Sequence, residues 1–211
     1  MLRKLPSAVS QVPTSWCGWA AIASVALGIS ACAVSSVQPL TVPLVYKSAS
    51  KPTLTDSLPC STIARVQASD ARTDKTLGTR SLESKPLTAD VSVSGDAGSW
   101  VEDGVQKSLT QAGMHVQGNG PALAISLDSL RTSESIWHRA SYDARIALST
   151  RLQSPTGKVC WQDKFEGTSG DYGYAGNIET YQGTLNGALD AAAQRLVQSQ
   201  GFRTALCHCG N

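Results

Sequence analysis

Apolar residues alternate with polar ones over several short stretches of the chain, a period of two that is typical of half-buried strands. Stretches of this kind, or short runs rich in β-branched residues, lie at 61–70, 87–95, 114–117, 122–130, 142–152 and 158–165. The sequence "SPTG" (154–157) between the last two predicts a hairpin turn. A glycine-rich segment, 166–177, follows and predicts a loop.

Two other stretches repeat apolar residues at the 3.6-residue period of a helix. The first contains Val101, Val105 and Leu109 and is followed by Gly113, a residue type that commonly ends helices. The second covers residues 178–199. Consecutive strands joined by short turns favour an antiparallel sheet. We therefore predict an α+β fold, an antiparallel sheet of about four to five strands with two helices packed on one face.

Residues 1–31 have the layout of a secretory signal peptide. Arg3 and Lys4 precede the uncharged stretch "WCGWAAIASVALGI", which covers residues 16–29. Its 14 residues are too few to span a bilayer, because a spanning helix needs about 20 apolar residues. The alternative is a buried core helix, but this stretch has no polar face to meet water.

The end of this stretch resembles the bacterial lipobox, with the order Ile29-Ser30-Ala31-Cys32. That resemblance implies cleavage between Ala31 and Cys32, a diacylglycerol on the Cys32 thiol, and an N-terminus acylated with a chain such as palmitate. An ordinary cut after Ala33 is the alternative, since Ala31-Cys32-Ala33 reads A-x-A. By resemblance to enterobacterial-type lipoproteins, Ala33 in place of Asp implies the periplasmic face of the outer membrane.

The remaining chain divides by composition. Residues 32–59 hold four of the nine prolines and much Ser and Thr, which predicts an extended tether with one short strand near 41–46. Residues 60–204 carry the periodic patterns and predict the α+β periplasmic domain. Residues 205–211 form a cysteine-containing tail.

Charge excludes one class of partner. The chain has 18 Lys and Arg residues against 16 Asp and Glu residues. Removing residues 1–31 takes away Arg3 and Lys4 and leaves 16 of each sign. No run of Lys or Arg remains, so a phosphate-binding surface for nucleic acid is not expected.

One segment of the domain carries a family resemblance. "DARTDKTLGTR" (70–80) after a first strand is similar to a stretch of YajG-like bacterial lipoproteins, as are the lipobox, the tether, "VQKSLTQAGMHV" (105–116) and a C-terminal helix. Auxiliary lipoproteins of ABC transporters share a similar outline and are a competing assignment. The YajG-like resemblance implies no settled biochemical activity.

Two segments are candidate partner-binding sites for an envelope protein or a glycan. The first gathers Asp70, Arg72, Asp74 and Arg80, and its alternative is a turn in which these charges pair with one another and with backbone amides. The second places Tyr172 and Tyr174 among glycines, a composition suited to recognition. Its alternative is that both rings cover one end of the core.

Four cysteines remain after the signal peptide and after Cys32: Cys60, Cys160, Cys207 and Cys209. In an oxidising compartment they predict disulfides, with three possible connectivities, and a bridge between Cys60 and Cys160 is one of them. "CHCG" (207–210) could also hold a metal, but a structural zinc site needs four ligands and a different spacing. Free thiols are the third possibility.

No catalytic constellation is apparent. His115, His138 and His208 lie outside the sequence contexts of serine hydrolases and zinc proteases, and no phosphate-binding glycine motif occurs. We therefore expect a non-enzymatic, membrane-anchored binding or scaffolding lipoprotein without a cofactor or metal. An envelope hydrolase or an auxiliary component of a transport system is the alternative.

Overall fold

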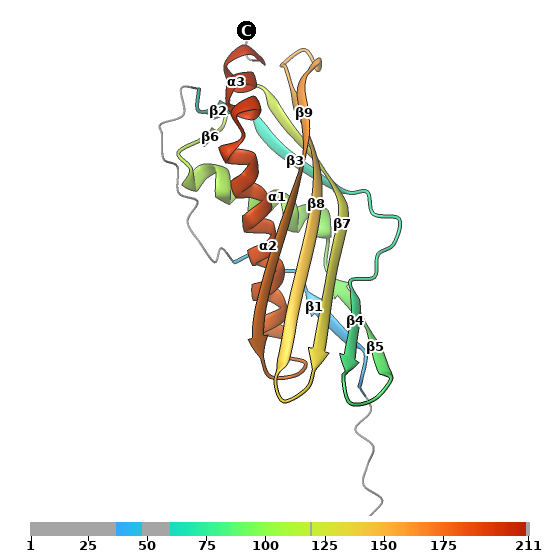
Figure 1. The fold of residues 1–211 in the computed structure, drawn as a ribbon. Coiled ribbons are helices and arrows are strands. Elements are labelled where there is room, and N and C mark those ends of the chain that lie inside the picture. Colours follow the sequence, from blue (N-terminus) through green and yellow to red (C-terminus); the bar gives the residue numbers. More distant parts are fainter. Residues whose placement is uncertain (1–36, 48–59, 119, 210–211) are drawn as a thin grey trace, which may run out of the picture. The chain divides into compact units, whose positions relative to one another are not determined.

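A computed structural model describes residues 37–47, 60–118 and 120–209 of the chain (Figure 1). Three helices occur in these residues: α1 Ala97–Gln111, α2 Ile178–Gln198 and α3 Gln200–Cys209. The strands are β1 Leu40–Pro43, β2 Thr62–Ile63, β3 Arg65–Asp70, β4 Gly78–Leu82, β5 Leu87–Ser94, β6 His115–Val116, β7 Ala122–Ile136, β8 Ala140–Gln153 and β9 Val159–Gly173. The predicted α+β class is confirmed, with more strands and one more helix than expected.

The main sheet has seven strands, in the order β1-β5-β4-β7-β8-β9 with β3 also paired to β7. β7, β8 and β9 form a long antiparallel meander, whereas β3 and β4 both run parallel to β7. β3 pairs with the first half of β7 and β4 with its second half, so the segment 71–77 between them leaves the sheet and returns. The sheet is thus mixed: the predicted antiparallel pairing is present in β4–β5 and in β7–β8–β9, and the parallel pairs of β1, β3 and β4 were not expected.

The glycine-rich segment 166–177 is mostly strand. β9 stays paired with β8 up to Gly173, which lies opposite Ala140. Gly167 is buried, and a side chain there would collide with the carbonyl oxygen of Ala188 in α2. The glycine therefore permits close packing of a strand on a helix, and composition alone made the segment look like a loop.

We expect Gly167→Ala to lower the free energy of unfolding by about 1–3 kcal/mol, because the added methyl group overpacks the β9–α2 contact. Gly183→Ala on α2 is the matched control, since a Cβ there meets no atom within 4 Å. The free energy of unfolding of the control should rise by about 0.5–1 kcal/mol, because alanine favours a helix more than glycine does. Urea denaturation followed by circular dichroism measures both. Equal effects of the two substitutions would contradict the packing explanation.

The two long helices cover one face of the sheet. Buried and exposed side chains alternate along β8, so only one of its faces is covered. α2 packs against β8 and β9, α1 packs against β3 and β7, and the two helices contact each other (Figure 1). Asp96 and Asn177 cap their N-termini by accepting hydrogen bonds from the amides of Ser99 and Thr180. Both predicted helices and their one-sided packing are present.

The segment 37–47, expected to be tether, belongs to the sheet. β1 pairs in parallel with β5, and Val42 and Tyr46 are buried. Polar side chains of α2 hold the same segment: Gln182 donates to the Pro43 carbonyl at 2.8 Å and Asn186 to the Val45 carbonyl at 3.1 Å. The folded domain thus begins well before Cys60, and it includes the short strand predicted near 41–46.

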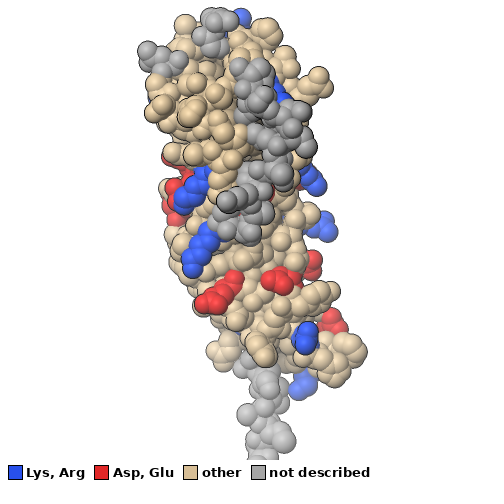
Figure 2. Space-filling view, turned by 90° about the vertical axis from the view of Figure 1, so that its left-hand side faces the viewer, with Lys and Arg blue, Asp and Glu red and all other residues tan. Residues whose placement is uncertain are grey.

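Residues 205–209 of the predicted tail are also folded. They lie in α3, where Phe202, Leu206 and Cys209 are buried. Charges on the face shown in Figure 2 are scattered and of both signs, without a continuous patch of either.

Candidate functional site

The segment 71–77 between β3 and β4 is held by its own ion pairs. Arg72 is buried and donates two hydrogen bonds to the Asp70 carboxylate, both at 2.8 Å. Asp74 accepts from the amide and hydroxyl of Thr76 and pairs with Arg131 of β7 at 2.8 Å. The charges of this segment thus pair with one another and with backbone amides, which is the turn that the sequence left open as the alternative to a binding site. A partner-binding role for this segment stays a prediction.

The pairing with Arg72 makes Asp70 a source of acid sensitivity. The side-chain hydrogen bonds from Arg72 outweigh the effect of burial and hold the pKa of Asp70 well below its ordinary value of 3.8. A carboxyl whose pKa is lower in the folded state stabilises the fold above its unfolded pKa, and this contribution is lost as the pH falls through the folded value.

We therefore expect Asp70→Asn to be less stable than the wild type at pH 7, with the difference shrinking below pH 3.8. Denaturation midpoints measured from pH 7 to pH 2 test this. Asp90→Asn is the control, because the Asp90 side chain is exposed and its carboxylate makes no hydrogen bond or ion pair within the described residues. A difference that stays constant with pH would contradict the role of the carboxylate charge.

Arg80, grouped with this segment in the sequence, lies in a different cluster. Its Nε donates to Oε2 of Glu134 at 2.5 Å, and the Glu134 side chain is completely buried. Tyr181 of α2 and Tyr142 of β8 lie 2.8 and 3.1 Å from the same carboxylate, and the Gly176 amide donates to it at 2.6 Å. Three donors from separate elements, Arg80, Tyr181 and Gly176, thus converge on one carboxylate, with the Tyr142 hydroxyl beside it.

This arrangement fixes the charge states of the cluster. Burial alone would raise the pKa of Glu134, but the hydrogen bonds from Arg80, Gly176 and Tyr181 more than offset it and hold the pKa below its ordinary value. Burial, together with the neighbouring Glu134 charge, raises the pKa of Tyr142 to about 12. The cluster therefore holds an ionised carboxylate whose oxygens are occupied by protein donors, which suits a structural role.

The buried cluster positions the connection between β9 and α2. The Tyr142 hydroxyl lies within hydrogen-bond distance of the Tyr174 carbonyl oxygen and accepts from the Asn177 amide at 3.2 Å. Gly176 has a φ of 72°, and a Cβ there would lie 2.8 Å from Nη2 of Arg80. A glycine is therefore needed where this connection passes over the guanidinium.

The two tyrosines of the second candidate segment are exposed at this end of the sheet. Tyr172 is 74% exposed and Tyr174 is 87% exposed, so neither ring covers the core. Trp137, in the turn between β7 and β8, is 68% exposed. We call these three residues the aromatic end. Between the two connections lies a hollow of about 570 Å³ lined by Ile136, Trp137, His138, Arg139, Ala140, Tyr172, Gly173, Tyr174 and Ala175.

Sequence reasoning missed Trp137 and Glu134. Trp137 lies in "IWHRA", which carries no glycine or proline to mark a turn. Glu134 follows Leu130 and Thr132 at the period of two that points side chains inward. An acidic residue at an inward position of a strand is the signal that could have indicated a buried ion pair.

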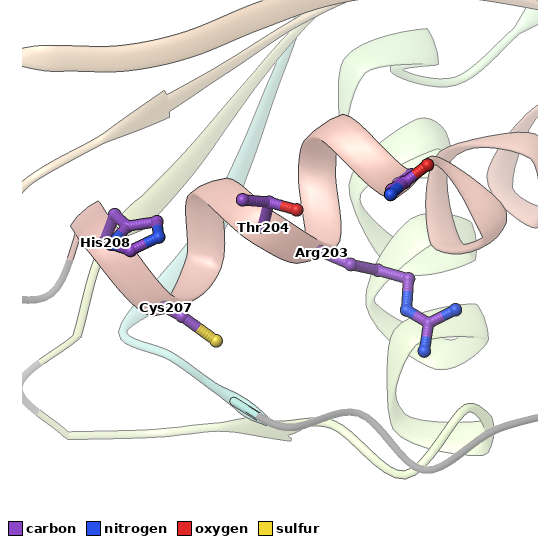
Figure 3. Close-up of a pocket in the computed structure, with 5 residues that line it drawn as sticks. Arg203, Thr204, Cys207 and His208 are labelled. Atoms are coloured by element: carbon purple, nitrogen blue, oxygen red, sulfur yellow. The ribbon is translucent and has the colours of Figure 1, made fainter.

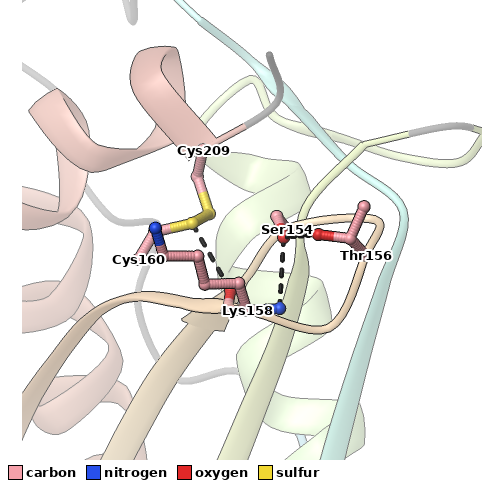
Figure 4. The surroundings of a disulfide bond; sticks show 5 residues. All are labelled: Ser154, Thr156, Lys158, Cys160 and Cys209. Carbon is pink, nitrogen blue, oxygen red and sulfur yellow. Dashed lines mark hydrogen bonds between the residues drawn. A yellow bond between two sulfur atoms is a disulfide. The ribbon is translucent and has the colours of Figure 1, made fainter.

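The four cysteines of the domain form two disulfides, Cys60–Cys207 and Cys160–Cys209. The bridge between Cys60 and Cys160 considered from the sequence is absent. Figure 4 shows Cys160 just after the turn that Ser154, Thr156 and Lys158 close by hydrogen bonds, joined to the end of α3. The C-terminal helix is thus fastened to the start of β9 and to the segment before β2.

The "CHCG" segment does not form a metal clip, because its two cysteines are bonded to different partners. A hollow of about 510 Å³ runs along α3, lined by Gln200, Arg203, Thr204, Cys207 and His208. All five residues lie on one helix, with Arg203 and His208 towards opposite ends of the row in Figure 3. Within residues 37–47, 60–118 and 120–209, no three His, Cys, Asp or Glu side chains are grouped to hold a metal ion.

The predicted cleavage and lipidation residues, Ala31 and Cys32, lie outside the described residues, as does the signal peptide. None of the helices in the described part of the chain is long and apolar enough to cross a membrane.

The chain shares its fold with protein XCC0632 from Xanthomonas campestris, of the family DUF330. The TM-score is 0.53 at 14% sequence identity, covering 78% of this chain and 95% of that protein. A candidate lipoprotein from Caulobacter crescentus gives a TM-score of 0.38 at 15% identity, over 54% of this chain and 86% of that one, which is too low to establish a shared fold. No protein-family model and no curated protein matches the sequence. The YajG-like assignment is not confirmed.

Proposed function

We propose that this chain is a lipid-anchored lipoprotein of the bacterial envelope whose domain binds or scaffolds another envelope component. The observation that carries the proposal is the order Ile29-Ser30-Ala31-Cys32 after a short uncharged stretch, followed within a few residues by a folded domain. Two disulfides suit an oxidising compartment such as the periplasm. Ala33 after Cys32 favours the outer membrane as the destination.

Lipidation accounts for membrane attachment in physical terms. Each buried methylene of an acyl chain contributes about 0.8 kcal/mol, and two or more chains anchor a protein stably where one holds only marginally. A triply acylated Cys32 would therefore keep the domain at a membrane without a spanning helix.

Intact mass and membrane partitioning of the purified protein test the anchor. The wild type should have the mass of residues 32–211 plus its acyl groups and should float with membranes, whereas Cys32→Ala should lose both properties. Cys17→Ala is the matched control, since Cys17 leaves with the signal peptide and the mature mass should not change. A mature chain that starts at Val34 without acyl groups would contradict the proposal and support the ordinary cut.

Cross-linking and co-purification from envelope fractions test the binding role. A scaffold should recover the same envelope protein or glycan repeatedly and should show no turnover. Recovery of an integral transport complex would favour the alternative, an auxiliary component of a transport system, over the YajG-like assignment. Specific hydrolysis by the purified domain would contradict both and favour the envelope hydrolase.

A further inference from the structure

The aromatic end and the start of the folded chain lie at the same end of the sheet. The connections β4–β5, β7–β8 and β9–α2 all turn at the lower end of Figure 1. β1 runs parallel to β5, which leads away from this end, so the residues before Leu40 point towards it. The chain therefore enters the domain close to the three exposed rings.

One side chain, Arg80, links the start of the folded chain directly to the aromatic end. Nη1 of Arg80 donates to the Gln38 carbonyl at 2.9 Å, and Nε of the same residue binds Glu134. Glu134 in turn accepts from the Gly176 amide, two residues after Tyr174. A single guanidinium thus separates Gln38 from the loop that carries Tyr174.

The length of chain before Gln38 limits how far this end can stand from the anchor. Gln38 follows Cys32 by six residues. Even fully extended, six residues reach only about 20 Å. If Cys32 is acylated, its glycerol lies at the membrane surface and Gln38 lies within about 20 Å of it. The aromatic end lies beside Gln38, across the Arg80 guanidinium, and is therefore brought near the same surface.

We propose that the aromatic end contacts the membrane that holds Cys32, with Trp137, Tyr172 and Tyr174 in the headgroup region of the bilayer. This inference rests on the lipidation proposed above. Trp and Tyr prefer the interface between lipid and water, because each ring has an apolar body and a polar hydrogen-bonding group. The three rings lie in or beside two adjacent connections. The hydrogen bonds of the Glu134 cluster hold the β9–α2 connection in place, so the rings are presented from an ordered part of the domain.

Electrostatics is a minor part of this contact. Arg139 and Asp171 flank the aromatic end with opposite charges. Attraction to anionic headgroups therefore contributes little, and burial of the rings dominates. The lipid anchor and the aromatic end together would attach the domain to the membrane at two points. The end of the sheet that carries the three rings would then face the membrane, and α3 and both disulfides would face away from it.

Tryptophan fluorescence can test the contact, because the mature chain has only three tryptophans: Trp100, Trp137 and Trp161. Trp100 is buried and donates to Asn186, and Trp161 packs against Phe165 and Phe202 near α3, at the far end. The full lipidated protein would be reconstituted into vesicles of phosphatidylethanolamine and phosphatidylglycerol, with and without phospholipid brominated on its acyl chains. Bromine quenches tryptophan only at short range.

We expect brominated lipid to remove the same absolute intensity from the wild type and from Trp161→Phe, and we expect Trp137→Phe to lose the lipid-dependent quenching. Bromines nearest the headgroup should quench most.

The contact is overturned if lipidated, vesicle-bound protein shows no quenching of Trp137 by lipid while aqueous iodide still reaches it. It is also overturned if Trp137 is shielded from both quenchers, which would indicate a protein covering this end. Mass and flotation report lipidation separately, so a protein without acyl chains refutes both proposals, whereas an anchored but unquenched protein refutes only the membrane contact.

Discussion

Replacing Glu134 by alanine is expected to lower the free energy of unfolding by about 3–5 kcal/mol. The carboxylate is completely buried, and its removal leaves the Arg80 guanidinium without its counter-charge inside the protein. It also leaves the Tyr181 hydroxyl and the Gly176 amide without their acceptor. Guanidinium denaturation under oxidising conditions, followed by circular dichroism, gives the measurement.

Two further variants separate the buried charge from general effects of substitution. Glu134→Gln keeps the shape and some hydrogen bonds but removes the charge, so its loss should be smaller than that of the alanine variant. Asp103→Asn removes an exposed partner of Lys107 and should cost less than about 0.5 kcal/mol. A folded Glu134→Ala protein as stable as Asp103→Asn would show that the ion pair is not buried in solution.

Loss of the Cys160–Cys209 disulfide should be equally severe. The loop-closure relation gives about 4 kcal/mol for these cysteines, whose sequence separation is 49, because the bridge limits the conformations of the unfolded chain. The double variant Cys160→Ser/Cys209→Ser should therefore unfold at a clearly lower denaturant concentration. Because it retains the Cys60–Cys207 bridge, neither of the two remaining domain cysteines should be a free thiol when the variant is denatured under non-reducing conditions.

A swapped double variant is the matched control for the connectivity. Cys60→Ser/Cys209→Ser leaves Cys160 and Cys207, which are bonded to different partners in the native fold. This variant should show two free thiols from the domain, those of Cys160 and Cys207, and should lose the stabilisation of both bridges. Identical stability and thiol content in the two double variants would contradict the pairing.

Sequence reasoning succeeded where a periodic pattern was long. α1 and α2 follow their apolar stripes, and β7 and β8 follow their alternation, so the α+β class and the coverage of one face of the sheet could be predicted. The lipobox lies outside the described residues and stays a prediction. Local composition was less informative at β9, because Gly167 permits close packing of the strand on α2 and Gly170 is paired with β8 rather than placed in a turn.

The remaining features depend on pairing between distant residues. β1 is a strand because Val91 and its neighbours lie beside it, and nothing within residues 37–47 indicates that partner. The Glu134 cluster requires Arg80 and Tyr181, and a shift in register between Leu127 and Ser129 interrupts the alternation that leads to it. The sequence left three possible disulfide pairings, and the choice depends on α3, which places Cys207 beside the segment before β2 and Cys209 beside the start of β9.

The incorporation of β1 into the sheet has a practical consequence for handling the protein. A soluble version that begins at Cys60, as composition would recommend, lacks Val42 and Tyr46 from the core and leaves β5 paired only with β4. The bared β5 would present a row of unsatisfied backbone amides and carbonyls, a template on which another chain readily adds a strand. Truncation at that point is therefore a route to aggregation, and a stable soluble domain has to begin before Leu40.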